Sequence, residues 1–428
     1  MGKNILVVAY ALSPTRGSEY SAAWNYVNEM SKNNTLVVLY GVSGEQMGDV
    51  NEMELWLTAN KITNVSFLPI LPDSLTLKLN YLNIKGIFSY SFYFAFRNWH
   101  RQVFKVAQEL IKTEKFDLVH NFNPTGYREP GYLWRLNIPY LWGPIGGAQN
   151  RPSQLFTMLT LSNKILFTLR NWINSFQFNT SLRLRNAVSS TDLLLCSTIE
   201  NKILFENKFK KVITYIPENA ITKSMSVTTE RIIDLKSVDV CNIIWIGSID
   251  LRKSLNLLIE ALALIELKNW HLHVIGNGPL KQSMQDLALK NKIESNITWH
   301  GQIPRIDVLN LLQLGHLHVI TSLGEGTPTT IWETMANGIP TITLNHCGMK
   351  DVICEKCGVK INIETVEQVK SDLASAITDL IQNPAKINNL SAGVLECAKF
   401  HTWGKRGQIF NEYYELAIEN WKQKREPK

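Results

Sequence analysis

The chain has 428 residues, which exceeds one ordinary domain, so two domains are expected. Hydrophobic residues make up 45% and charged residues 19% of it, which excludes a disordered chain and allows a sizeable core. The net charge is +7, but no recognisable nucleic-acid-binding motif accompanies it, so we expect no nucleic-acid partner.

Strands and helices are expected to alternate through the first half of the chain. Residues 4–10 form a continuous apolar run typical of a buried parallel strand, and a loop then leads to a helical pattern over 20–30. Further strands are expected at 35–40, 116–120, 139–142, 193–196 and 212–216. This alternation predicts a parallel α/β sheet.

Two windows in this half are basic and apolar and contain no acid. The positive residues of window 74–108 are Lys78, Lys85, Arg97, Arg101 and Lys105, and those of window 151–191 are Arg151, Lys164, Arg170, Arg183 and Arg185. Basic and apolar residues together suit an anionic membrane surface, although a solvated basic face beside an ordinary core is the alternative.

A second α/β pattern follows residues 222–239, which lack a strong pattern. Strands are expected at 242–246, 271–275, 297–301, 316–321 and 340–344, with helices at 254–267, 280–290, 305–314, 329–337 and 403–421. We therefore assign residues 1–222 to an N-terminal Rossmann-like domain, 223–240 to a linker and 241–402 to a C-terminal Rossmann-like domain. Residues 403–428 form a helix expected to pack back on the N-terminal domain.

The segment from Thr321 to Glu333 carries the most chemical information. A strand is expected to end here, and Gly326, Thr327 and Pro328 lead into a helix. The free N–H groups at the start of that helix suit an anion such as a diphosphate. Glu325 beside that anion is suited to accept hydrogen bonds from sugar hydroxyls, and Glu333 is placed to reach a ribose diol.

The spacing of Glu325 and Glu333, with the trailing residues 336–340 (Ala-Asn-Gly-Ile-Pro), resembles the E-x7-E arrangement of the retaining glycosyltransferases of family 4. These group 1 glycosyltransferases have the GT-B fold, which is α/β with two Rossmann-like domains facing across a central cleft. The resemblance implies that Glu325 contacts the donor sugar and that Glu333 holds the ribose hydroxyls. It also implies retention at the anomeric carbon without a metal. In such a fold, residues 1–222 would bind the acceptor and residues 241–402 the nucleotide-sugar donor.

Other segments resemble this family in the order expected of it. The cations Arg252 and Lys253 fit the position that meets the diphosphate, but Ser248 stands where family members usually carry an earlier cation. The remaining residues for which the resemblance implies donor contacts are Gly17, Gly247, Gly276, Asn277, His300 and Gly301. His120, at the end of a strand, is assigned as catalytic with a structural histidine as the alternative, because many members carry their histidine at the position of Phe122.

The function expected from these residues is hexosyl transfer from a UDP- or GDP-sugar to a glycan or lipid-linked acceptor in bacterial surface polysaccharide synthesis. No cofactor or metal is expected. A sugar-nucleotide epimerase and a catalytically degenerate GT-B subunit that binds a membrane or partner stay open. Without a signal-peptide pattern or a long apolar run, the expected location is cytoplasmic, either soluble or peripheral on the inner face of the plasma membrane.

Two of the six cysteines form a Cys-x-x-Cys motif, Cys354 and Cys357. Such a pair belongs to many metal and redox sites. The intervening Glu355 and Lys356 and the following Gly358 favour instead a turn between a helix end and a strand.

Overall fold

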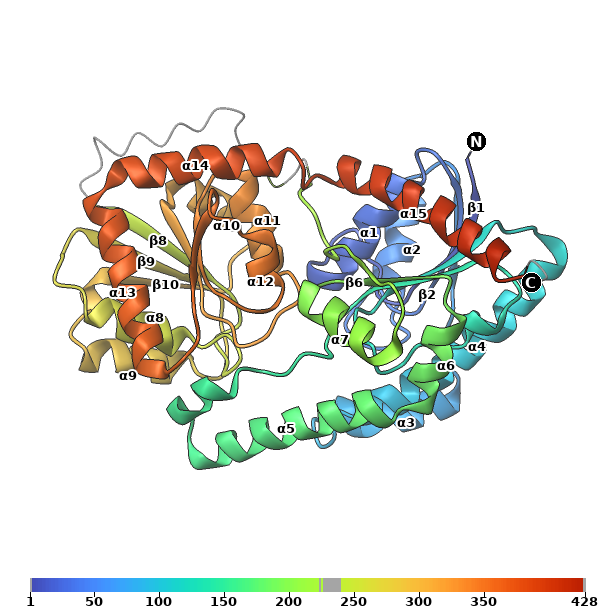
Figure 1. Cartoon of the computed structure of the whole chain (residues 1–428), viewed down its shortest axis with the longest axis horizontal. Helices are drawn as coiled ribbons and strands as arrows, with labels where there is room; N and C mark the ends of the chain where they lie inside the picture. Colours follow the sequence, from blue (N-terminus) through green and yellow to red (C-terminus); the bar gives the residue numbers. More distant parts are fainter. Residues whose placement is uncertain (1, 223–224, 226–239, 426–428) are drawn as a thin grey trace. The chain divides into compact units, whose positions relative to one another are not determined.

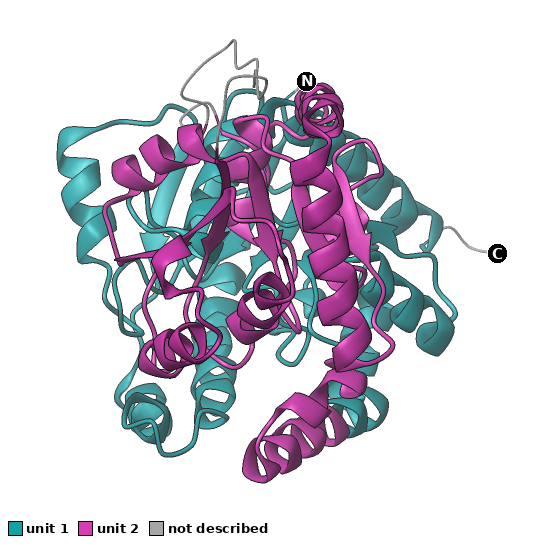
Figure 2. Cartoon of the chain, turned by 90° about the vertical axis from the view of Figure 1, so that its left-hand side faces the viewer, with its two compact units in different colours: residues 1–149, 174–218, 403–428 teal, residues 150–173, 219–402 magenta. Residues whose placement is uncertain are grey.

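The computed structural model describes residues 2–222, 225 and 240–425 (Figure 1). The chain divides into two compact units (Figure 2), of which unit 1 comprises residues 1–149, 174–218 and 403–428 and unit 2 comprises 150–173 and 219–402. Residues 150–173, which we had assigned to the N-terminal domain, thus group with the second unit. Apart from residues 225 and 240, the expected linker at 223–240 lies outside the described residues.

Unit 1 is built on a seven-stranded parallel sheet with the strand order β3-β2-β1-β4-β5-β6-β7. Its strands are β1 (Asn4–Ala9), β2 (Thr35–Tyr40), β3 (Val65–Pro69), β4 (Leu118–Asn123), β5 (Tyr140–Ile145), β6 (Leu193–Cys196) and β7 (Thr214–Tyr215). The central strands β1, β4 and β5 are almost entirely buried, as expected for parallel strands covered on both faces.

Helices cover both faces of this sheet. They are α1 (Ser18–Met30), α2 (Asn51–Ala59), α3 (Ser74–Ile84), α4 (Ser91–Thr113), α6 (Leu182–Ser190), α7 (Ile199–Phe209) and α15 (Trp403–Gln423), with the short helix η1 (Leu133–Arg135). One core joins β1, β2 and β5 to the buried face of α4. On the other face, α15 contacts α1 and the strands β4, β5 and β6. Helix α5 (Leu161–Thr180) is divided between the two units.

Unit 2 is built on a six-stranded parallel sheet with the order β10-β9-β8-β11-β12-β13. Its strands are β8 (Cys241–Ile246), β9 (Trp270–Ile275), β10 (Ile297–Gly301), β11 (Leu317–Ile320), β12 (Thr341–Leu344) and β13 (Gly358–Ile361). Its helices are α8 (Leu255–Ala263), α9 (Lys281–Lys290), α10 (Arg305–Leu314), α11 (Thr329–Ala336), α12 (Cys347–Val352), α13 (Val366–Gln382) and α14 (Pro384–Ala398), with η2 (Ser153–Met158) and η5 (Glu294–Asn296). Side chains of α8 and α13 share a core with the sheet, whereas α11, α12 and α14 share a separate one.

The structure confirms the predicted fold class of two parallel, Rossmann-like α/β domains. Strands β3 and β13 were not predicted, because both include half-buried residues and so lack the continuous apolar pattern of the buried strands. Helix α8 ends at Ala263, earlier than the predicted residue 267. Among the described residues, no helix is long and apolar enough to cross a membrane.

Candidate active site

Loops at the carboxyl ends of neighbouring strands in unit 2 carry most of the predicted donor-binding residues. After β8 the chain places β9 and β10 on one side, and it then returns to place β11 on the other side of β8. The order of strands therefore reverses between β8 and β11, and ligands of open α/β sheets bind at such a switch point.

A cavity of about 380 Å³ opens beside the ends of β8, β9 and β10. Its lining includes five of the predicted residues, Gly247, Ser248, Gly276, Asn277 and Gly301. Gly276 has a φ of +130°, and a Cβ on it would come within 2.0 Å of the carbonyl oxygen of Gly247. Only glycine allows the loops after β8 and β9 to approach this closely. The apolar side chains of Ile246, Ile275 and Ile303 in the cavity lining suit a planar ring such as a nucleobase.

Beside this cavity, two cations converge on one carboxylate. The Nζ atom of Lys253 lies 2.7 Å from Oε1 of Glu325, and the guanidinium of Arg252 pairs with the same oxygen. Only 13% of the Lys253 side chain and 14% of the Glu325 side chain are exposed. A diphosphate would offer both cations a doubly charged partner, which would release Glu325 to accept hydrogen bonds from a sugar.

Hydrogen bonds hold the two loops that carry this cluster in place. Asp250 Oδ1 accepts from the backbone N–H groups of Arg252 and Lys253 at 2.8 and 2.9 Å, and this turn precedes α8. The Leu323 N–H donates to the Arg252 carbonyl at 2.7 Å, and the Thr321 hydroxyl donates to the Lys253 carbonyl at 2.8 Å. The cations are thus fixed against the loop that carries Glu325.

Arg151 is a third cation near this cluster, and the sequence did not indicate it as a site residue. Asn171 pins its backbone through two hydrogen bonds of 3.1 and 2.9 Å, and its guanidinium lies 4.1 Å from the ring centroid of Phe167. Burial, and then the neighbouring charges of Arg170 and Arg252, lower the pKa of Arg151 to about 10, so it is still cationic at neutral pH.

Glu333 lies on the second turn of α11, with only 7% of the residue exposed. Its Oε1 atom is 3.1 Å from the guanidinium of Arg305, the first residue of α10. Burial raises the pKa of Glu333, and the charge of Arg305 opposes that rise. A buried carboxylate paired with Arg305 still has acceptor capacity for hydrogen bonds from a diol that enters the site.

Gly326, Thr327 and Pro328 form the end of the loop before α11, and Pro328 is the N-cap of that helix. A proline side chain cannot accept a hydrogen bond, so Pro328 cannot cap the N–H groups of the first turn. The N–H groups of this turn and the positive end of the helix dipole therefore begin just after the loop of Glu325, Gly326 and Thr327.

Two further predicted donor residues lie outside the cavity lining. The imidazole of His300 hydrogen-bonds to His273 at 3.0 Å and stacks on it, so its side chain packs against the neighbouring strand β9. Gly17 is the N-cap of α1 in unit 1, and a Cβ there would meet no atom within 4 Å. The packing of unit 1 therefore does not itself require glycine at this position.

His120, which we assigned as catalytic, lies in the interior of unit 1 and is 0% exposed. Its Nδ1 atom is 2.8 Å from the Tyr26 hydroxyl and 3.1 Å from that of Tyr414, and its Nε2 atom is 2.7 Å from the Gly143 carbonyl. Burial lowers its pKa to about 3. A fully enclosed, neutral imidazole with both nitrogens occupied does not contact a substrate, so the structure favours the structural alternative and we drop the catalytic role.

Unit 1 holds a larger cavity of about 650 Å³ near the ends of β1 and β4. Its lining combines the carboxylates Glu19 and Glu45 with aromatic side chains, including Tyr20, Phe92 and Tyr93. Aromatic faces and carboxylates together are suited to a carbohydrate, because one packs on the ring and the other accepts from hydroxyls. The sequence did not predict this cavity, because its lining comes from six separate segments between residues 10 and 129.

A comparison with protein families finds a match within unit 2. Residues 229–393 match the family described as "Glycosyl transferases group 1". An uncharacterized glycosyltransferase of Haemophilus influenzae is 24% identical over 63% of this chain and 72% of its own length. A sulfoquinovosyl transferase of Arabidopsis thaliana, SQD2, is 26% identical over 43% of this chain, and the match spans 35% of that protein.

Solved structures resemble the whole chain. The lipopolysaccharide outer core galactosyltransferase WaaB in its apo form has a TM-score of 0.66 at 15% identity, covering 97% of this chain and 99% of that one. HepE of Anabaena, in complex with UDP and glucose, has a TM-score of 0.61 at 12% identity, with 96% and 99% covered.

These findings support a group 1 glycosyltransferase. The two Rossmann-like units have the GT-B fold, which confirms the architecture implied by the resemblance. The family match contains Lys253, Glu325 and Glu333, so the ion-pair cluster and the buried carboxylate of α11 lie in the matched region.

Proposed function

We propose that this group 1 glycosyltransferase is a retaining, metal-independent enzyme of family 4 that uses a UDP- or GDP-sugar donor. The observation that carries the proposal is the convergence of Lys253 and Arg252 on Glu325 beside a glycine-lined cavity. The cavity would hold the nucleobase, Glu333 the ribose diol and Glu325 the hydroxyls of the sugar.

In the proposed reaction, the bond between the anomeric carbon and the diphosphate oxygen breaks, and its electron pair stays on the diphosphate. Lys253, Arg252 and the amino end of α11 stabilise the charge that develops there. The acceptor hydroxyl attacks from the same face, and its proton passes to the departing phosphate oxygen. Glu325 positions the sugar and forms no covalent bond, so the configuration is retained.

Ser248 leaves this chain without the cation that members of the family usually carry at that position. Arg151 is another cation near the same cluster. A Cβ on Gly324 would lie 3.7 Å from Cγ of Arg151, so the arginine side chain lies against the loop that carries Glu325. We propose that Arg151, supplied from residues 150–173, takes the place of the missing cation beside the diphosphate. This favours an active enzyme over a degenerate, non-catalytic protein.

A thermal-shift screen of UDP- and GDP-sugars, followed by a transfer assay with the sugar that binds, tests the donor proposal. One nucleotide sugar should raise the Tm, and its sugar should appear on an acceptor with the anomeric configuration unchanged. Binding without transfer would favour the degenerate protein, and isomerisation of the free donor would favour an epimerase. An inverted product would exclude retention.

For the acceptor, we propose a lipid-linked or membrane-borne glycan of the bacterial surface. Helices α3 and α4 and their connection expose apolar side chains that include Leu75, Leu82, Ile87 and Phe88, with Lys78 and Lys85 among them. Asn80, Ile84 and Phe92 of the same helices line the 650 Å³ cavity of unit 1. A basic, apolar surface continuous with a carbohydrate-like cavity suits a glycan presented by an anionic membrane.

Flotation with phosphatidylglycerol vesicles at low salt tests the membrane contact. The wild type should float, and the Ile87→Asp/Phe88→Asp double variant should not. Leu55→Asp is the matched control, because Leu55 is 70% exposed and Ile87 72%, but Leu55 lies on α2. Equal flotation of all three proteins, or none by the wild type, would exclude this surface.

A further inference from the structure

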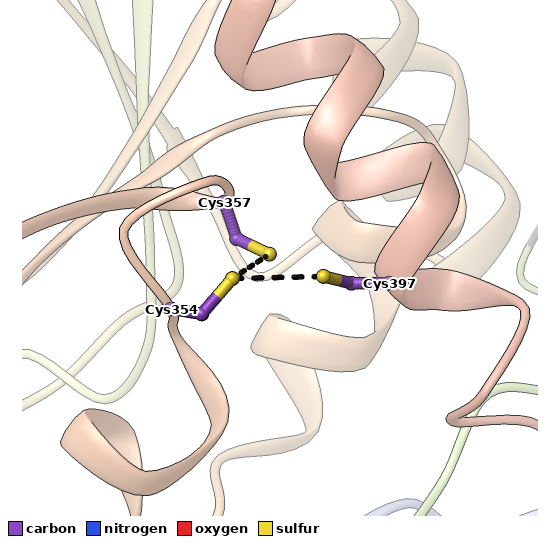
Figure 3. Close-up of side chains that lie close together, drawn as sticks. All are labelled: Cys354, Cys357 and Cys397. Carbon is purple, nitrogen blue, oxygen red and sulfur yellow. Dashed lines mark hydrogen bonds between the residues drawn. The ribbon is translucent and has the colours of Figure 1, made fainter.

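The fold brings three cysteines of unit 2 together. Cys354 and Cys357 lie on the turn between α12 and β13, and Cys397 lies in the last turn of α14. Their sulfur atoms point toward one another (Figure 3), with 2.9 Å between Cys354 and Cys357 and 3.6 Å between Cys354 and Cys397. All three sulfurs lie within 4.8 Å of one another.

Local geometry builds this convergence from both sides. The Cys357 N–H donates to the Cys354 carbonyl at 2.9 Å, which closes the turn that carries both cysteines. On the helix side, a Cβ at Gly393 would come within 2.0 Å of the Lys356 carbonyl oxygen. Glycine at 393 therefore allows α14 to lie against the turn, which brings Cys397 to the two other sulfurs.

We propose that Cys354, Cys357 and Cys397 form a binding site for a thiophilic d¹⁰ cation, with Zn²⁺ as the representative ion. Sulfur ligands about 2.3 Å from zinc are about 3.8 Å apart at the corners of a tetrahedron. The observed sulfur distances of 2.9 and 3.6 Å require shifts of only about 1 Å to reach this spacing.

A redox dithiol is the main alternative for a Cys-x-x-Cys pair. A redox pair needs only two sulfurs. It does not explain why the Cys397 sulfur lies beside them or why α14 approaches the turn so closely at Gly393. The cluster is reachable from solvent, because Cys354 and Cys397 are half-buried while Cys357 is buried. Three sulfurs leave the fourth position of a tetrahedron for water or another small ligand.

The bound ion would stabilise the packing of α14 against α11, the helix that carries Glu333. Helix α14 packs against α11, and the Ser391 hydroxyl donates to the Gly338 carbonyl just beyond the end of α11 at 2.6 Å. By tying α14 to the turn before β13, the ion would stiffen the wall that supports the helix carrying Glu333. This role is structural, so zinc binding does not depend on the proposed transfer reaction.

Zinc titration of the reduced, metal-stripped full chain tests the site, with a chromophoric chelator as competitor. The wild type should take up one equivalent of Zn²⁺, and its Tm should rise by about 5 °C when zinc greatly exceeds its Kd. Co²⁺ in place of zinc should give a sulfur-to-cobalt charge-transfer band. Cys397→Ser should weaken binding by about 100-fold or more, whereas the control Cys241→Ala, at a buried cysteine of β8, should bind as the wild type does.

The proposal is wrong if the fully reduced wild type takes up no more zinc than the Cys354→Ser/Cys357→Ser/Cys397→Ser variant. Where that variant does not fold, alkylation of the wild type replaces it. Zinc should then slow modification of Cys354 and Cys397, as read by mass spectrometry, and unchanged alkylation rates would equally exclude the site.

Discussion

The two units use polar side chains in opposite ways. In unit 1, His120, Tyr26 and Tyr414 form an enclosed network of neutral groups, because burial lowers the pKa of the histidine and raises those of both tyrosines. In unit 2, Lys253 and Glu325 are oppositely charged and partly exposed in loops.

The difference follows from where each group lies relative to its strand. His120 is within β4, paired with Val7 and Leu141 of the neighbouring strands, so its side chain packs between sheet and helices. Lys253 and Glu325 come after the ends of β8 and β11, where the sheet no longer covers them. A histidine within a central strand, such as His120, therefore stabilises the fold. A charged residue that follows the end of a strand, such as Lys253 or Glu325, can contact a ligand.

Loss of the charged cluster should have the largest effect. Lys253→Ala and Glu325→Ala should each lower kcat by about 10²–10³-fold, because each removes a group that we propose contacts the reacting donor. Lys290→Ala, an exposed lysine of α9, is the control. Steady-state transfer rates measure the effect, and near-normal turnover in both variants would disprove the site assignment.

The enclosed network should respond in stability instead. His120→Asn should lower the free energy of unfolding by about 1–3 kcal/mol, because it leaves buried hydroxyl and carbonyl groups without their partner. Urea unfolding measures this loss, and the KM for the donor should stay unchanged. A variant with wild-type stability and no transfer would restore a catalytic role for His120.

Arg151 extends the charged cluster and should have a moderate effect. Arg151→Ala should raise the KM for the donor by about tenfold, with Arg151→Lys in between, since a lysine retains the charge but not the planar fork. Lys164→Ala is the control, because this exposed cation lies in the same segment of unit 2. An unchanged KM in Arg151→Ala would leave the role of the missing family cation to Arg252 alone.

Glu333 of unit 2 is buried, as His120 is in unit 1. Its replacement should change the free energy of unfolding by the smallest amount among these variants. Because its pKa is raised, the folded chain keeps this proton at a pH where the unfolded chain has lost it. Stability therefore falls as the pH rises above the ordinary glutamate pKa of about 4.3. Glu333→Gln should be more stable than the wild type at neutral pH, and the difference should vanish toward about pH 4.

Urea unfolding between about pH 4 and 8 measures this trend, with the exposed Glu294→Gln as control. The same Glu333→Gln variant should bind nucleotide more weakly, because an amide is a poorer acceptor for a ribose diol than a carboxylate. A Glu333→Gln variant that is less stable at every pH would show that the pair with Arg305 outweighs burial.

The sequence predicted unit 2 in more detail than unit 1. Apolar strands, helix starts and glycine turns are local signals, and they placed the loops that carry Gly247, Gly276 and Glu325. The cavity of unit 1 combines side chains from separated segments, and no local pattern encodes such a convergence.

The site residues that we did not predict from the sequence are far along the chain from the residues that they contact or approach. Arg151 lies about 100 residues before Arg252, and only the grouping of residues 150–173 with unit 2 brings the two near each other. Cys397 lies 43 positions after Cys354, and their contact depends on the path of α14 against the turn before β13. The turn at Cys354 and Cys357 was itself predicted, but its third sulfur was not.

The position of α15 in the chain affects when unit 1 can complete its fold during translation. Tyr414 on this helix completes the hydrogen bonds around His120, yet all of residues 219–402 are made before it. At about 5–20 residues per second, the ribosome takes on the order of ten seconds or more to cover that interval. Until α15 has been made, the nascent unit 1 exposes the surface that this helix will cover, so unit 1 completes its fold only after residues 219–402 have been synthesised.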